Sequence, residues 1–409
     1  MRRKHGSSIR FRLPVAPASA PAVKPRLHVP AIGGSHQFAH FLPVAARLAE
    51  RETVDVRIFA PTPEDAHELA ELAVTIGVLL PPVTIMELPR AFKAVVPRKM
   101  AKLARLLAWA RQLRQCEAIL STERTSTILK RLPGRCPPLI HIPHGAGDRA
   151  VGFEDRFRFF DLVLVAGPKD RDRLVAEGVV RKSACAVAGP IKVAAALQSR
   201  TRRNPLFAND RPVVLYNPHF SPKLSSAESF LHPLAQAVLD DGRYNLVIAP
   251  HIRMAQHWTV QRKGEWQALA VPDRIMVDLG SRRSTDMTYT LGADLYIGDV
   301  SSQVYEFLVR PRPCLFVNAH AADWQDNPDY AMWNLGEVVA PDCDIPAMIE
   351  RAFNQHERYR QVQQTRVRAA LHGLDWDAAG EPFFADPDPI TRGADLVEAN
   401  MQGAQFVRR

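Results

Sequence analysis

A histidine flanked by glycine stands directly after a short apolar run in the first half of this 409-residue chain. The run LIHI (139–142) is typical of a buried strand, and the turn after it presents His144 between Pro143 and Gly145. An imidazole transfers protons near neutral pH, and a glycine lets a substrate approach the backbone closely. We therefore interpret His144 as a candidate general base with Asp148 as its catalytic neighbour. The alternative is a loop histidine without a role.

Two further histidines follow apolar runs in the second half of the chain. VVLY leads to His219, and NLVIA leads to His251. A cation follows each imidazole, Lys223 after the first and Arg253 after the second. Because the carboxyl ends of parallel strands meet at one edge of a sheet, these side chains are expected to form a clamp for a diphosphate. A single histidine after a strand more often has a structural role, whereas two histidines at equivalent strand ends are a stronger indication of a binding site.

The segment 294–306 (DLYIGDVSSQVYE) reads as a strand, a turn and the start of a helix. Ser301 or Ser302 is expected to cap this helix, whose first backbone N–H groups can bind an anion. Glu306 stands one turn further on and is expected to accept hydrogen bonds from ribose or substrate hydroxyls. Plain capping beside a surface glutamate is the alternative, and composition alone favours it.

A glycine-rich turn also follows the first apolar run, RLHVPAI. Gly33, Gly34, Ser35 and His36 precede a helical pattern that extends over 36–51. Glycines there allow backbone N–H groups to approach a ligand. Neither GxGxxG nor GxxxxGK[ST] is present, so a tight turn without a ligand explains the segment equally well.

Short apolar runs alternate with helical stretches along most of the chain, which predicts parallel sheets covered by helices. A polar, basic and proline-containing segment interrupts the pattern before it restarts at VVLY. We predict two Rossmann-like α/β domains that face each other across a cleft. The expected boundaries are a flexible basic lead (1–24), an N-terminal domain (25–197), a linker (198–212), a C-terminal domain (213–380) and a tail that packs back on the first domain (381–409).

The composition is that of a globular protein, with 46% hydrophobic and 23% charged residues. Five scattered cysteines without a CxxC pair argue against a disulfide framework and a structural zinc site, and they fit a reducing compartment. No apolar run reaches the ~18 residues of a spanning helix, and the basic N-terminus lacks the apolar core of a secretory signal. A cytoplasmic protein is expected.

The net charge of +10 indicates nucleic acid, anionic lipid or phosphorylated small molecules as partners. Segment 91–115 carries seven Lys or Arg residues and no acidic one, with apolar residues and Trp109 between them. With Pro97 in its first turn, it predicts a basic amphipathic helix that docks on an anionic membrane surface. An ordinary surface helix is the alternative. Nucleic acid is disfavoured, since only 8% of residues are aromatic and no basic motif interleaved with aromatic residues is present.

Taken together, these segments resemble the CDP-glycerol glycerophosphotransferases of teichoic acid and capsule synthesis. The resemblance covers roughly 139–339, about half of the chain, and is carried by Pro143-His144-Gly145, Pro250-His251, 298–302 with Glu306, and 312–316 (RPCLF). The family typically has His-Gly-Thr, Lys-x-His-Pro and Asp-Tyr-Ser-Ser. Here His-Gly-Ala, Pro-His-Ile and Asp-Val-Ser-Ser stand instead.

The resemblance implies a GT-B fold, in which two Rossmann-like domains enclose a cleft. It implies that His144 takes a proton from an acceptor hydroxyl on the N-terminal side. His251, Ser301 and Ser302 are implied to bind the donor diphosphate, with Asp299 supporting their turn. Neither a metal nor another cofactor is implied, because helix N-termini and basic side chains take the place of a metal.

The expected function is the transfer of a glycerophosphate-like or glycosyl group from a nucleotide-activated donor, CDP-linked by preference. The acceptor is expected to be a hydroxyl of a lipid-linked molecule or a polysaccharide, at the inner face of the cell membrane. His219 and Arg253 join the expected donor site, and the 33–36 turn lies on the acceptor side. The alternatives are a non-hydrolysing UDP-sugar epimerase, another GT-B glycosyltransferase, or a non-enzymatic basic protein that binds a polymer.

Overall fold

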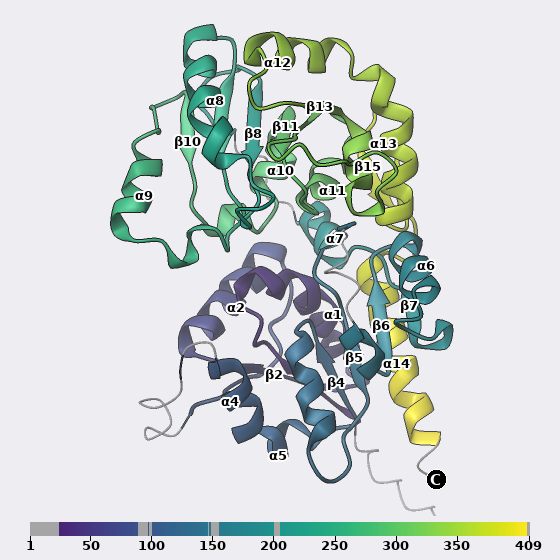
Figure 1. Ribbon diagram of the computed structural model, residues 1–409. Coiled ribbons are helices and arrows are strands. Elements are labelled where there is room, and N and C mark those ends of the chain that lie inside the picture. The colour runs from purple at the N-terminus through teal and green to yellow at the C-terminus, as the bar shows by residue number, and fades with distance from the viewer. Residues whose placement is uncertain are drawn as a thin grey trace, which may run out of the picture.

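The computed structural model describes residues 24–88, 97, 100–145, 147–148, 155–199 and 205–406. Within these ranges two parallel sheets form the centres of two domains, and Figure 1 shows the first domain below the second. The prediction of two α/β domains with parallel sheets is confirmed. The lead predicted for 1–24 lies outside the described residues except for Lys24.

The first sheet joins seven of the described strands, all parallel, in the order β3-β2-β1-β4-β5-β6-β7. The strands are β1 (Arg26–Pro30), β2 (Asp55–Ala60), β3 (Val83–Ile85), β4 (Ala118–Ser121), β5 (Leu139–His141), β6 (Leu162–Val165) and β7 (Cys185–Val187). The helices around them are η1 (Ser35–Gln37), α1 (Phe38–Glu50), α2 (Pro63–Ile76), α4 (Ala101–Ala108), α5 (Ala110–Leu113), η3 (Arg124–Arg131), η5 (Asp155–Phe159), α6 (Pro168–Ala176), η6 (Lys182–Ala184) and α7 (Ile191–Gln198). Neighbouring residues such as Ile119 and Leu120 enter two different hydrophobic cores, one on each face of the sheet. Burial on both faces explains why such strands are continuous apolar runs.

The second sheet joins six of the described strands, also parallel, in the order β10-β9-β8-β11-β12-β13. The strands are β8 (Val213–Asn217), β9 (Asn245–Ile248), β10 (Ile275–Val277), β11 (Leu295–Gly298), β12 (Cys314–Val317) and β13 (Glu337–Val339). The helices are α8 (Ala227–Asp241), η7 (Ala255–His257), α9 (Val260–Gln267), η8 (Arg282–Ser284), α10 (Thr288–Gly292), α11 (Gln303–Phe307), η9 (Pro328–Leu335), α12 (Ile345–Asn354) and α13 (Glu357–Ala370). Val214 and Leu215 again enter separate cores on the two faces.

The end of the chain returns to the first domain. A short antiparallel pair, β14 (Leu374–Trp376) and β15 (Pro382–Phe384), leads to α14 (Pro389–Phe406), which packs against α1 and α7. Ile390, Ala394 and Val397 of α14 belong to the core of the first domain. Figure 1 shows α14 beside that domain, so the chain crosses between the domains a second time.

The described part of segment 91–115 differs from the single long helix that the sequence predicts. It forms α4 and α5, which are separated at Trp109. The indole N–H of Trp109 donates to the backbone carbonyl of Glu87 at 2.9 Å, and its ring lies edge-on to Phe59. Since α4 begins at Ala101, Pro97 lies before the helix and not in its first turn. The tryptophan expected to face a membrane therefore packs against the protein.

A buried carboxylate joins the two domains behind the cleft. Asp148, only 2% exposed, lies in the loop after β5 and accepts hydrogen bonds from Lys169 of α6 at 2.8 Å and from Arg366 of α13 at 3.0 Å. The hydroxyl of Tyr305 on α11 donates to the other oxygen of the carboxylate at 2.6 Å. Two cations and one hydroxyl from both domains thus converge on Asp148.

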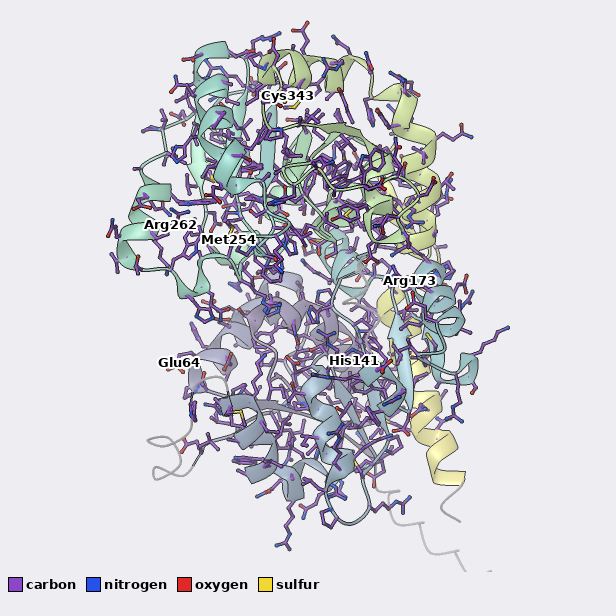
Figure 2. All side chains as sticks on the ribbon, viewed as in Figure 1. Glu64, His141, Arg173, Met254, Arg262 and Cys343 are labelled. Carbon is purple, nitrogen blue, oxygen red and sulfur yellow. The ribbon has the colours of Figure 1, made fainter. Side chains whose placement is uncertain are left out.

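Among the residues that the structure describes, three further ion pairs cross the domain boundary. They join Arg173 to Asp329 at 2.9 Å, Lys192 to Glu306 at 2.7 Å, and Arg282 to Glu71 at 3.2 Å. Figure 2 shows Arg173 on α6 where the first domain meets the second. The Lys192 pair is nearly enclosed, whereas both side chains of the Arg282 pair are exposed and contribute little to stability.

Asp148→Ala is expected to lower the free energy of unfolding by ~2–4 kcal/mol, because it removes the buried carboxylate that accepts from Lys169, Arg366 and the buried hydroxyl of Tyr305. Urea unfolding measures this loss. Asp172→Ala is the matched control, since it removes an exposed carboxylate from α6 that is paired with Arg171, and it is expected to cost below ~1 kcal/mol. Equal losses in the two variants would contradict the role assigned to Asp148.

Candidate functional site

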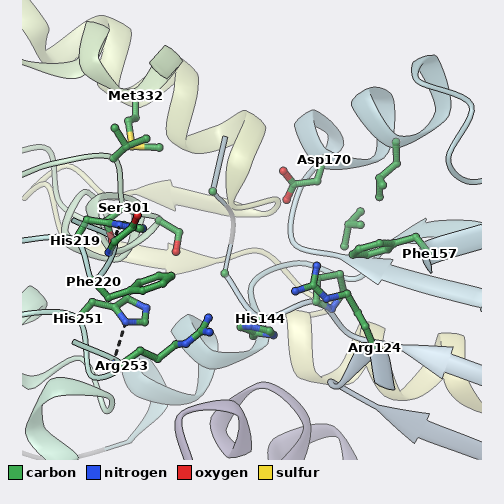
Figure 3. Close-up of a pocket in the computed structure, with 18 of the residues that line it drawn as sticks. Arg124, His144, Phe157, Asp170, His219, Phe220, His251, Arg253, Ser301 and Met332 are labelled. Atoms are coloured by element: carbon green, nitrogen blue, oxygen red, sulfur yellow. Dashed lines mark hydrogen bonds between the residues drawn. The ribbon is translucent and has the colours of Figure 1, made fainter. Parts of the chain in front are cut away.

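A cavity of about 380 Å³ lies between the domains, at the carboxyl ends of both sheets. Figure 3 shows His144 between its two walls. The labelled side chains are His219, Phe220, His251, Arg253, Ser301 and Met332 on the second-domain wall, and Arg124, Phe157 and Asp170 on the first-domain wall. The structure therefore brings the predicted residues His144, His219, His251, Arg253, Ser301 and Ser302 to a single cavity.

His144 is held by the loop that leaves β5. Its ring is open to the cavity, yet its pKa is lowered by the loss of surrounding water and by the positive charge of Arg124. A hydrogen bond to the backbone of Thr122 opposes this lowering. Because a carbonyl only accepts, the ring nitrogen that faces Thr122 carries the proton and the other keeps its lone pair. His144 is thus a neutral imidazole that can accept a proton at neutral pH.

Two more imidazoles lie close to His144. The ring of His36 lies 5.7 Å from it and that of His40 lies 6.5 Å from it, measured between ring centroids. Burial, followed by the charge of His144, lowers the pKa of His36 to about 3, and burial lowers the pKa of His40 well below its ordinary value. His36, His40 and His144 also line a smaller cavity of about 70 Å³ that adjoins the first. His144 therefore lies beside two uncharged rings.

The turn at residues 33–36 has a structural reason for its glycines. A Cβ added to Gly33 would lie 1.7 Å from Oε1 of Gln37, whose side chain accepts a hydrogen bond from Thr122 at 2.9 Å. Gly34 has φ of 99°, in the left-handed region. Neither glycine lines the main cavity, and Ser35 lines a third cavity of about 190 Å³ between α2 and η8. Of this predicted loop, His36 alone lies beside the base.

The two histidines of the second domain face the cavity as neutral hydrogen-bonding groups. Nδ1 of His219 accepts from the backbone N–H of Ser221 at 3.0 Å, and Nδ1 of His251 accepts from that of Arg253 at 3.2 Å. These bonds leave the proton on Nε2 of each ring, where it can be donated to a ligand. Burial, followed by the charge of His219, lowers the pKa of His251 to about 3.

The positive charge on this wall comes from Arg253. Its guanidinium lies 4.6 Å from the ring centre of Phe220, and that ring stands between His219 and His251. Lys223, which the sequence placed in the same clamp, is exposed and does not line the cavity. The clamp predicted from two imidazoles and two cations thus contains one of those cations.

Asp299 supports the loops that carry these groups. Its fully buried carboxylate accepts from the backbone N–H groups of His219 at 2.8 Å and Ser226 at 3.1 Å, which ties the loop after β8 to the end of β11. Burial raises the pKa of Asp299 to about 6. Asp299 is therefore placed behind the cavity wall and orients His219.

The serine pair begins a shorter helix than the sequence suggests. Ser302 is the N-cap residue of α11, which has only five residues, and Ser301 accepts from the backbone N–H of Gln303 at 3.3 Å. Ser302 makes no such capping bond and faces the His144 loop. A Cβ added to Gly145, which has φ of +90°, would lie 2.8 Å from the hydroxyl oxygen of Ser302. The base loop and the serine turn are thus in close contact across the domain boundary.

Glu306 and Asp148 lie apart from the main cavity. Both oxygens of Glu306 accept from Lys192, at 2.7 and 2.8 Å, and the pair lines the smaller cavity beside His144. Asp148 was grouped with His144 as catalytic from the sequence, but its carboxylate lies in the interdomain network and does not line any of these cavities.

Sequence reasoning missed three residues at the site. Lys192 follows the unpredicted strand β7, and the pair Gly189-Pro190 just before it is the signal that marks a strand-to-helix turn. Arg124 and Asp170 lie at the starts of η3 and α6. Asp170 is the acidic side chain among the described lining residues, and burial raises its pKa while Lys169 pairs with it at 2.8 Å.

Gly145→Ala is expected to abolish binding of a nucleoside diphosphate, because the new methyl group collides with Ser302. Gly178→Ala is the matched control, since Gly178 also has a left-handed φ of +68° but open space around it. Both variants are expected to lose roughly 1–2 kcal/mol of stability from backbone strain. Calorimetric titration with CDP and UDP measures binding in both variants, and only Gly145→Ala is expected to lose it. Unchanged binding in Gly145→Ala would contradict the close contact between Gly145 and Ser302.

No family model matches the chain, and no curated protein matches it in sequence. Solved structures match it over nearly its whole length. A proposed UDP-N-acetylglucosamine 2-epimerase from Listeria monocytogenes has a TM-score of 0.62 at 13% identity and covers 94% of this chain and 97% of its own. The epimerase of Neisseria meningitidis bound to UDP-GlcNAc has a TM-score of 0.55 at 12% identity, with 92% and 99% covered.

The wall teichoic acid polymerase TagF, in a variant soaked with CDPG, has a TM-score of 0.56 at 12% identity, with 92% of this chain and 88% of its own covered. At such low identity these likenesses show the fold alone. They confirm that this chain has the GT-B fold, with its two parallel-sheet domains enclosing a cleft.

Proposed function

We propose that this chain is a transferase that moves a glycerophosphate-like group from a CDP-linked donor to a hydroxyl of an acceptor. The observation that carries the proposal is the close approach of the His144 loop to Ser302 across the domain boundary. A neutral base of the first domain there faces hydroxyl and imidazole donors of the second domain in one cavity. This is the arrangement that group transfer between two bound substrates needs.

The reaction follows from these positions. His144 accepts the proton of the acceptor hydroxyl as its oxygen attacks the phosphorus of the transferred group. The bond between that phosphorus and the bridging oxygen of the donor breaks, and its electron pair goes to the leaving nucleotide phosphate. Nε2–H of His251, the hydroxyl of Ser302 and the guanidinium of Arg253 stabilise the charge that develops. His219 and Ser301 complete the proposed donor site, and Glu306 accepts hydrogen bonds from the ribose of the donor.

The acceptor is proposed to be lipid-linked or a polysaccharide presented at a membrane surface. Leu106 and Leu113 of the basic segment are buried in the first domain, whereas Met100 and Leu107 are 49% and 44% exposed. Exposed apolar side chains among cations suit the surface of an anionic bilayer. No helix in the described ranges is long and apolar enough to cross a membrane.

Epimerisation of a UDP-sugar is the second candidate, favoured by the similarity to epimerase structures over almost their entire length. Such a reaction must remove a proton from carbon. The acidic side chain that lines the main cavity among the described residues, Asp170, is already paired with Lys169. The imidazoles are better suited to a hydroxyl proton, and so transfer is the first choice.

Incubation with CDP-glycerol and a synthetic lipid-linked hydroxyl acceptor is expected to release CMP only when the acceptor is present. His144→Gln is expected to slow this release by roughly 10²–10⁴-fold. Chromatography of the nucleotides measures it. Conversion of UDP-GlcNAc to its 2-epimer without any acceptor, followed by NMR, would overturn the transferase proposal in favour of the epimerase.

The pH dependence offers a second readout of the same variant. Activity requires the neutral ring of His144, and its pKa lies below the ordinary value of 6.5. The value of kcat/KM is therefore expected to fall on the acid side with a midpoint below pH 6.5. An acid limb centred above pH 6.5 would show that another group is the base.

A further inference from the structure

A buried lysine enters the cleft from the first domain. Lys192 stands in the first turn of α7, is 8% exposed, and directs its ammonium to both oxygens of Glu306 on α11. The pair lines the cavity of about 70 Å³ together with His144, His251 and Ser302. These three residues also line the main cavity, so the lysine lies beside the point where base and donor groups meet.

Stability does not explain this position. A buried ion pair loses much of its mutual attraction to the cost of removing both charges from water, and apolar replacements are often neutral or stabilising. A cation in the first turn of a helix is also unfavourable, because the positive end of the helix dipole lies there. The charge of Lys192 reaches across the cleft, since it contributes to lowering the pKa of both His40 and His251. Such a placement suits a site that receives negative charge.

The proposed reaction creates negative charge at this place. The electron pair of the broken bond goes to an oxygen of the leaving nucleotide phosphate, while the acceptor proton goes to His144. The rings of His36 and His251 are neutral at pH 7 because their pKa values lie near 3, so they donate hydrogen bonds without a full charge. On the second-domain wall the full charge comes from Arg253. The first domain offers two cations that could hold the phosphates from the other side. Arg124 lines the main cavity, and Lys192 lines the smaller cavity, where it contacts Glu306 of the second domain. Lys192 is the one that reaches across the domain boundary and is the better counterpart to Arg253.

We infer that Lys192 is this counterpart, that it binds the donor phosphates and stabilises the leaving nucleotide phosphate, and that Glu306 positions its ammonium. The inference rests on the proposed function and names a ligand chemistry, the diphosphate of a nucleotide donor. The ammonium stays protonated throughout and donates hydrogen bonds, so the step requires no further proton transfer. The carboxylate oxygens of Glu306 keep lone pairs for a ribose hydroxyl, and the two roles of Glu306 are compatible.

Calorimetric titration of the full chain with CDP and with cytidine tests the inference. Lys192→Gln is expected to weaken CDP binding roughly tenfold or more and to leave cytidine binding unchanged, because only CDP carries phosphates. Lys192→Arg is expected to retain CDP binding within about threefold, since the cation is preserved. Lys182→Gln, which removes an exposed lysine from η6, is the matched control.

The double variant Lys192→Gln/Glu306→Gln distinguishes phosphate binding by Lys192 from a purely structural role. It removes both buried charges, so that no carboxylate is left buried without a cation. The inference predicts that the affinity for CDP relative to that for cytidine stays low in this variant, because the lost ribose contact of Glu306 affects both ligands alike. Recovery of wild-type CDP affinity would overturn it, as would an unaffected Lys192→Gln. If the wild-type protein binds neither CDP nor UDP, the proposed function falls together with the inference.

Discussion

The carboxylate of Asp148 joins the two domains at the end of the loop that carries His144, and the geometry of the site depends on it. Three residues lie between His144 and Asp148, whose carboxylate accepts a hydrogen bond from Tyr305 of the opposite domain at 2.6 Å. Tyr305 stands three residues after Ser302 on the same short helix. The base loop and the serine turn are therefore anchored to each other from behind, and Gly145 allows them to meet in front.

The second feature of the site is the low charge of its imidazoles. Among the described residues, six histidines line the cleft from both domains, namely His36, His40, His141, His144, His219 and His251. Burial lowers the pKa of His36, His40, His141, His144 and His251, so that these rings act as neutral donors and acceptors. Full positive charge is left to a few cations, with Arg253 on one domain and Lys192 on the other. Such a cleft can receive a diphosphate and still keep an unprotonated base beside it.

Much of the fold follows from the sequence. β5, β8 and β9 agree within one residue with the runs LIHI, VVLY and NLVIA, because strands buried on both faces are continuous apolar runs. The edge strands β3, β7 and β13 were not predicted, since each has only three residues, which is too short for an apolar run or an alternation to be distinctive. The break between α4 and α5 was also missed, because the contact of Trp109 with Glu87 is tertiary and leaves no local pattern.

The positions of site residues that directly follow a strand could be predicted from the sequence. The positions that depend on a partner far away in the chain could not. His144, His219, His251 and the serine pair lie at strand ends, so their gathering followed from parallel-sheet topology. The position of Asp148 depends on Arg366, which lies 218 residues away, and that of Glu306 depends on Lys192, which lies 114 residues away. The exposure of Lys223 reflects a loop conformation that no spacing rule fixes.

A crystal structure of the protein soaked with CDP tests the central claim most directly, because it locates the phosphates. The account predicts density for the diphosphate in the interdomain cavity, within hydrogen-bond distance of His251 and Ser302 and adjacent to His144. Nucleotide density on the outer surface of either domain, or in the cavity between α2 and η8, would contradict it.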